Sequence, residues 1–91
     1  MIEGKLNKVY RLDIQGTLIT KIPDTMNSLQ FLDCSRSPLS TIPRNDKLIT
    51  LICCNSKLSD ISNINFLETL EMVDSNINRI HYIPRLSRIV Y

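Results

Sequence analysis

The three cysteines are the first residues whose chemistry could define a site. Cys53 and Cys54 are adjacent, so in an extended segment their side chains point to opposite faces and cannot share one zinc ion without distortion. Cys34 and Cys53 occupy equivalent places in two similar segments. Packing as small apolar residues is the favoured interpretation of this pair, and a bond between them remains open on spacing alone. Cys54 is expected on an exposed face, which leaves a reactive thiol as the alternative, although no histidine or helix N-terminus lies beside it to activate the thiol. The opposite facing of Cys53 and Cys54 predicts no metal site.

Histidine and carboxylate residues are the other candidates for catalysis. His81 is the only histidine; no recognisable nucleophile motif accompanies it, and a solvated corner is its expected place. Asp13, Asp33 and Glu71 recur at one position of the repeat described below, where a pair of carboxyl groups with a raised pKa is conceivable. Because no second catalytic group accompanies them, a hydrophilic recognition face is the favoured interpretation. The chain has two glycines, too few for a phosphate-cradling loop, so we expect neither enzymatic activity nor a cofactor.

Length and charge limit the classes of partner. The 91 residues form one domain at most. A net charge of +2 gives no electrostatic reason to expect nucleic acid as the main partner. Arg79, Arg85 and Arg88 gather near the end of the sequence, where a solvated surface is the favoured interpretation and phosphate binding is the alternative.

No segment has the composition of a targeting or membrane-spanning element. The first ten residues lack the continuous apolar core of a signal peptide, and no stretch approaches the roughly 20 apolar residues of a membrane span. The odd number of cysteines, three, does not suggest a secreted disulfide framework. We therefore expect an intracellular, cytoplasmic location and no membrane partner.

An internal repeat must position all of these residues. Apolar residues follow the spacing L-x-x-L-x-L, a short polar break, then L-x-x-I, in copies that start at Val9, Leu29, Leu48 and Leu67, with a partial copy from Leu86. Apolar and polar residues alternate within each copy, which is typical of a half-buried strand. The starts of the four full copies are 20, 19 and 19 residues apart, so the period is essentially 19 residues. That period leaves no room for a full return helix and predicts extended chain or short 3₁₀ turns there.

The pattern resembles the leucine-rich repeat family, whose consensus is L-x-x-L-x-L-x-x-N/C-x-L. The segment LDCS at 32–35 and the I-P pairs at 22–23 and 42–43 are similar to a short-period subclass from bacteria and giant viruses. The resemblance covers residues 9–91 and implies one domain over 1–91. It implies an α/β-type repeat solenoid that is mostly β, wound as a right-handed superhelix with one parallel strand per repeat. A concave sheet face, an extended or 3₁₀ convex side and minimal caps are further implications.

One position departs from this family. The asparagine of the family consensus would fall at Thr17, Ser37, Ser56 and Ser75. An amide offers two donors and a carbonyl, whereas a hydroxyl offers one donor and its lone pairs. We expect these hydroxyls to replace the asparagine by satisfying buried loop carbonyls.

The exposed side of the strands is the predicted site of function. Outward positions carry an apolar stripe flanked by acidic residues, which is typical of a protein-binding surface. Strand propensity alone is the alternative reason for isoleucine and valine at these positions. The residues expected to contact a protein partner are Phe31, Asp33, Ile52, Glu71 and Val73.

A structural role is the alternative function. Only about eight residues precede the first repeat, which suggests a subunit of a larger assembly, such as a minor virion protein. This hypothesis places the contacts, including self-association, at the terminal strand edges around Leu6 and from Leu86 to Tyr91. For a viral protein, the expected location is the host cytoplasm or the virion.

Overall fold

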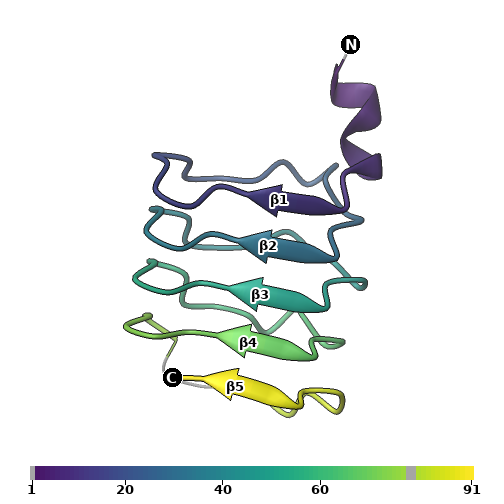
Figure 1. Cartoon of the computed structure of the whole chain (residues 1–91). Coiled ribbons are helices and arrows are strands. Elements are labelled where there is room, and N and C mark those ends of the chain that lie inside the picture. Colours follow the sequence, from purple (N-terminus) through teal and green to yellow (C-terminus); the bar gives the residue numbers. More distant parts are fainter. Residues whose placement is uncertain (1, 78–79) are drawn as a thin grey trace.

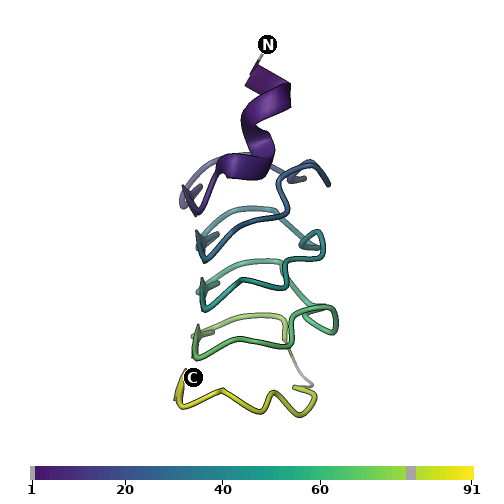
Figure 2. The same ribbon diagram turned by 90° about the vertical axis from the view of Figure 1, so that its right-hand side faces the viewer.

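The computed structural model describes residues 2–77 and 80–91. Five parallel strands form one sheet in the order β1-β2-β3-β4-β5. A 3₁₀ helix, η1 (Ile2–Lys8), precedes β1 (Arg11–Asp13), β2 (Phe31–Asp33), β3 (Thr50–Ile52), β4 (Thr69–Glu71) and β5 (Arg88–Val90). Figure 1 shows the strands one above another, and Figure 2 shows them along one side of the stack with the return segments opposite. The expected solenoid is confirmed: it is mostly β, with about four turns.

The register is the same between every pair of strands. Leu12 pairs with Leu32, Leu32 with Leu51, and Leu51 with Leu70, so the middle residues of the strands form one inward row. Pairing continues beyond the three-residue strands, because Ile14 donates its backbone N–H to the carbonyl of the next turn at 2.9 Å. The repeat period fixes this register, since a slip of one residue would turn the leucines outward.

The core lies between the sheet and the return segments. Eight leucines are fully buried there, namely Leu29, Leu32, Leu39, Leu48, Leu51, Leu58, Leu67 and Leu70. Each occupies the same place in its turn as a leucine or isoleucine in the next. Burial of this apolar surface, worth about 25 cal/mol per Å², is the main stabilising contribution to the stack.

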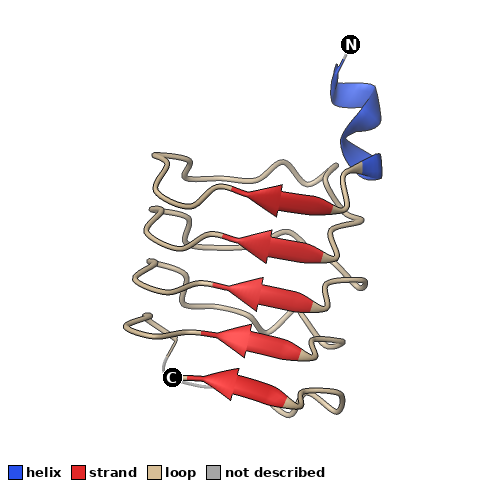
Figure 3. Ribbon diagram, in the orientation of Figure 1, coloured by secondary structure: helices blue, strands red, loops and turns tan. Residues whose placement is uncertain are grey.

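The return segments are irregular, as the short period predicts. Figure 3 shows them as loops between the strands. They contain single turns, in which Met26 donates its N–H to the Pro23 carbonyl at 3.0 Å and Ile64 donates to the Ile61 carbonyl at 3.1 Å. In the part of the chain that the structure describes, no helix lies on this side.

The residues before the first repeat form η1, which the repeat pattern does not predict. A segment of seven residues is too short to show helical periodicity in its sequence. Leu6 is half-buried against the core, and its carbonyl accepts the backbone N–H of Val9 at 3.2 Å. In Figures 1 and 2 the rest of η1 extends away from β1 rather than lying across the first turn.

A residue with left-handed backbone follows each of the first four strands at the same distance. These residues are Gly16 (φ 69°), Arg36 (φ 54°), Asn55 (φ 53°) and Asp74 (φ 54°). Glycine adopts this conformation freely, and asparagine and aspartate tolerate it better than other residues do. Arg36 is therefore the strained member of the set.

The corner hydroxyls bond within their own turns rather than from turn to turn. Thr17 and Ser37 each donate to the carbonyl three residues earlier, at 2.7 and 2.8 Å, which confirms for these two the expectation of a satisfied loop carbonyl. The hydroxyls of Ser56 and Ser75 instead accept the backbone N–H two residues later, at 3.3 Å. For these two serines the expectation was wrong, because the oxygen closes a local turn as an acceptor.

Asn45 makes the connection between turns that the corner hydroxyls do not make. Its side chain is fully buried. The Oδ1 atom accepts the N–H of Leu29 at 2.8 Å, and Nδ2 donates to the carbonyls of Met26 at 3.3 Å and Pro43 at 3.0 Å. The equivalent position in the other turns is apolar, with Leu6, Met26, Ile64 and Ile83. A polar residue in an apolar column was the sequence signal for this bond.

Candidate functional site

The outer sheet face consists of the strand side chains that point away from the core, in three rows across the strands. The first row holds Arg11, Phe31, Thr50, Thr69 and Arg88. The second row holds Asp13, Asp33, Ile52, Glu71 and Val90. The third, just beyond the strands, holds Gln15, Ser35, Cys54 and Val73. Because parallel strands lie about 4.8 Å apart, neighbours within a row are in contact distance.

The structure brings the five predicted contact residues together on this face. Phe31 and Asp33 lie on β2, Ile52 lies on β3 and Glu71 on β4, while Val73 follows β4. All five are half-buried. Ile52 is the register partner of Asp33 on one side and of Glu71 on the other. An apolar side chain therefore lies at the centre, between two carboxylates.

Arg11 covers one side of Phe31, the apolar residue that β2 contributes to this face. The guanidinium carbon of Arg11 lies 3.9 Å from the centroid of the Phe31 ring, which is a cation–π contact. One face of the ring is thus covered by a cation rather than exposed. The repeat predicts the outward position of Arg11 but not its contact with Phe31, although the register places the two residues side by side.

Two of the acidic residues have a local structural contact. Asp13 accepts the backbone N–H of Gln15, and Asp33 accepts that of Ser35, each at 3.1 Å through Oδ1. These bonds close the turn after the strand, as aspartate side chains often do. In residues 2–77 and 80–91 the one ion pair joins two exposed residues of a return segment. The carboxylates of the outer sheet face are therefore not neutralised by an ion pair within the described chain.

The buried cysteines pack as apolar residues, as expected. Cys34 and Cys53 are fully buried and form no disulfide. Burial raises the pKa of the Cys34 thiol to about 12, and it raises the pKa of the Cys53 thiol further above its usual range, so both stay protonated near neutral pH. Cys54 is half-buried on the outer sheet face.

His81 joins two turns instead of lying at a solvated corner. Its ring is half-buried. The Nε2 atom lies 3.0 Å from the carbonyl oxygen of Ile64 and 3.1 Å from Oδ1 of Asn65. Since a carbonyl only accepts, Nε2 carries the proton in this arrangement. The expectation of a solvated histidine was wrong because the return segments of adjacent turns lie within hydrogen-bond reach.

Arg85 and Arg88, the two described arginines near the end of the sequence, have different surroundings. Arg88 lies in the first row of the outer sheet face, while the Arg85 guanidinium lies 5.4 Å from the ring centroid of Phe66, on the loop before β4. Arg79 lies outside the described residues. Arg85 and Arg88 are both exposed, as the interpretation of a solvated surface predicts.

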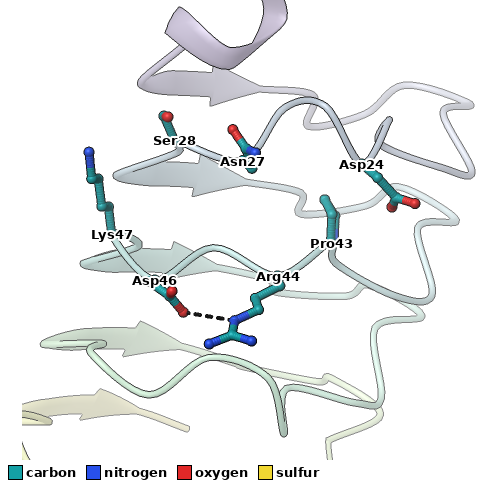
Figure 4. Close-up of a pocket in the computed structure, with 7 residues that line it drawn as sticks. All are labelled: Asp24, Asn27, Ser28, Pro43, Arg44, Asp46 and Lys47. Carbon is teal, nitrogen blue, oxygen red and sulfur yellow. Dashed lines mark hydrogen bonds and ion pairs between the residues drawn. The ribbon is translucent and has the colours of Figure 1, made fainter.

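One hollow lies away from the outer sheet face. It has a volume of about 470 Å³ and is lined by Asp24, Asn27, Ser28, Pro43, Arg44, Asp46 and Lys47. Figure 4 shows these side chains on two adjacent return segments, with Arg44 bonded to Asp46; that ion pair spans 3.2 Å. Most of the lining is exposed and polar. A small-molecule site needs an apolar enclosure with a few convergent polar groups, which this hollow lacks.

The described residues contain neither a metal-binding cluster nor a membrane-spanning helix. Within residues 2–77 and 80–91, no group of three histidine, cysteine, aspartate or glutamate side chains is placed to hold a metal ion. No helix in those ranges has the length and apolar character needed to cross a bilayer.

No family model, curated protein or solved structure matches this chain.

Proposed function

We propose that this chain is a leucine-rich-repeat module that binds a protein partner through the outer sheet face and performs no catalysis. The observation that carries the proposal is the position of Ile52 between Asp33 and Glu71. A half-buried apolar centre with a charged rim is the arrangement that protein interfaces share. One strand per turn and a period of 19 to 20 residues support the family part of this proposal. The free thiols of the three cysteines support an intracellular, cytoplasmic location.

The substitution Ile52→Glu tests this function. It places a third carboxylate between Asp33 and Glu71 while leaving the inward residues of β3 unchanged, so the fold is expected to persist. Affinity capture from the source cells, with bound proteins identified by mass spectrometry, is expected to lose the partner. Ile49→Glu is the matched control, because Ile49 is 39% exposed and lies before the strand. A partner captured equally by the native chain and by Ile52→Glu overturns the proposal.

A structural role is the second candidate, and β5 favours it. Within the described residues β5 pairs only with β4. Its inward residue Ile89 and the preceding Leu86 are half-buried, and a strand with an unpaired edge is a template for pairing with another chain. Light scattering after size-exclusion chromatography separates the candidates: an assembly that Ile89→Lys dissociates supports the structural role, and a stable monomer excludes self-association through this edge.

A further inference from the structure

We propose that the partner segment on the outer sheet face is a basic amphipathic helix. An apolar side chain of this helix contacts Ile52, and lysine or arginine residues on either side approach Asp33 and Glu71. This inference rests on the proposed function, because it specifies the chemistry of the partner for the same surface. Three features of the face support it: its paired backbone, the spacing of its second row, and its charge.

The backbone of the sheet is already paired. Cys34 donates its N–H to the Ile52 carbonyl, and Cys53 donates to the Glu71 carbonyl, both at 2.8 Å. A segment that lies across the strands therefore finds few free backbone groups and must satisfy its own N–H and carbonyl groups. A helix does so internally, whereas an extended peptide pairs with a strand edge instead.

The spacing of the second row also fits a helix. Asp33, Ile52 and Glu71 are register partners on successive strands, about 4.8 Å apart at each step. On one face of a helix, residues three or four apart are separated by about 5.2 Å along the axis, and residues seven apart by about 10.5 Å. In an extended chain, residues that share a face repeat at intervals of about 6.7 Å. Asp33 and Glu71 are two strand steps apart, about 9.6 Å. This distance is close to the separation of helical residues seven apart, whereas it falls between one and two same-face intervals of an extended chain.

The negative charge around Ile52 favours a positively charged helix. The two neighbours of Ile52 in its row are carboxylates, and Asp13 adds a third beyond Asp33. The basic residues of the face, Arg11 and Arg88, are both in the first row on the outermost strands. Arg11 is already stacked on a ring. A partner with cations on both sides of its apolar contact therefore complements this region, and an acidic partner is repelled.

Three synthetic peptides of about 18 residues, long enough to form a helix in contact with a surface, test the inference. The first presents lysine, leucine and lysine on one face at positions i, i+4 and i+7. The second has the same composition with both lysines on the opposite face, and the third has glutamate in place of the two lysines. By fluorescence anisotropy, the first peptide is expected to bind about tenfold more tightly than either of the others, a difference of about 1.4 kcal/mol. Equal affinity for the first two overturns the inference.

Substitutions that keep the fold identify the contact. In the double variant Asp33→Asn with Glu71→Gln the charges are lost, but the amide Oδ1 still accepts the Ser35 N–H that closes the turn. Binding of the first peptide is expected to weaken about tenfold. The matched control is Asp24→Asn with Asp46→Asn, which removes the same charge from the hollow of Figure 4. An equal loss in both double variants overturns the inference, because it shows attraction by net charge alone.

Two further results separate the helix from the proposed function. A peptide with the sequence of the first except for a proline at its centre cannot form a continuous helix. If it binds as tightly as the first peptide, the helical part of the inference is overturned. If Ile52→Glu abolishes capture of the cellular partner while the first peptide does not bind, the proposed function stands and the basic helix is excluded. If Ile52→Glu leaves capture unchanged, the proposed function itself falls.

Discussion

The inner turns and the end turns of the stack use the same repeat positions but bury them to different extents. Leu32, Leu51 and Leu70 are 0% exposed. Leu12 and Ile89 occupy the same row at its two ends and are half-buried. Because each turn contacts only its neighbours, burial is complete only where a turn lies on both sides. The comparison shows that stability belongs to the contacts between turns rather than to any turn by itself.

Truncation of a leucine in an inner turn is expected to have the largest effect. Leu51→Ala leaves a cavity in the fully buried row and is expected to lower the free energy of unfolding by about 2–5 kcal/mol. Ile89→Ala removes a half-buried side chain and is expected to cost about 1 kcal/mol, since neighbouring chain and solvent relax around the site. Urea unfolding followed by circular dichroism measures both. Equal losses would remove the distinction between inner and end turns.

Loss of the buried Asn45 amide is expected to have the next largest effect on the free energy of unfolding. Asn45→Ala leaves the N–H of Leu29 and the carbonyls of Met26 and Pro43 without this side-chain partner, and is expected to cost about 1–3 kcal/mol. Asn63→Ala is the matched variant, because Asn63 is half-buried and makes one bond between turns, to the Ile42 carbonyl at 2.8 Å. Its expected cost is about 0.5–1.5 kcal/mol. A smaller loss for Asn45→Ala than for Asn63→Ala contradicts the assignment of Asn45 as the main polar connection.

Alkaline pH is expected to destabilise the inner turns through their thiols. The folded-state pKa of Cys34 is about 12 against a usual value of 9.0, so the unfolded chain loses this proton first. The contribution of the protonated Cys34 thiol to the free energy of unfolding is fully present below pH 9. It declines as the pH rises toward 12, by up to about 1.4 kcal/mol per pH unit. Urea unfolding between pH 8 and 11 or so measures the slope. The Cys34→Ala variant should show a shallower slope, and an unchanged slope contradicts the prediction.

The corner residue Arg36 gives the smallest expected effect, and one of opposite sign. Arg36→Gly relieves a left-handed conformation, and is expected to raise the free energy of unfolding by about 0.5–1 kcal/mol after the entropic cost of glycine. Its side-chain bond to Gln15 is exposed and contributes little. Asn55→Gly, one turn later, is the control and should change stability less, because asparagine already tolerates this backbone. Thermal unfolding of both variants measures the difference.

The strands and their register follow directly from the sequence. The positions of Leu12, Leu32, Leu51 and Leu70 in the repeat predict both the inward row and its pairing, because a fixed period leaves one way to stack the turns. For the same reason the five predicted contact residues lie together on the outer sheet face. Their role in binding remains a prediction that the capture experiment addresses.

The departures from the sequence analysis come from contacts that the repeat pattern does not contain. The pattern treats each position by its average character, so it predicts no role for Asn45 and places His81 at a solvated corner. Asn45 bonds to the Met26 carbonyl and His81 to the Ile64 carbonyl, each in the preceding turn. The contact of Arg11 with Phe31 depends on side chains of adjacent strands, which alternation of apolar and polar residues does not specify. Helix η1 precedes the repeats and lies outside their periodicity.

The constant spacing of register partners has a consequence for the order of folding. The two members of every inward pair are separated by one repeat period, so closing any one turn costs nearly the same loop entropy. The stabilisation gained by closing a turn differs, because only the leucines of the central turns are packed against another turn on each side. Folding is therefore expected to begin around β2, β3 and β4 and to spread outward one turn at a time. Backbone amides of β1 and β5 should exchange with solvent deuterium well before those of β3.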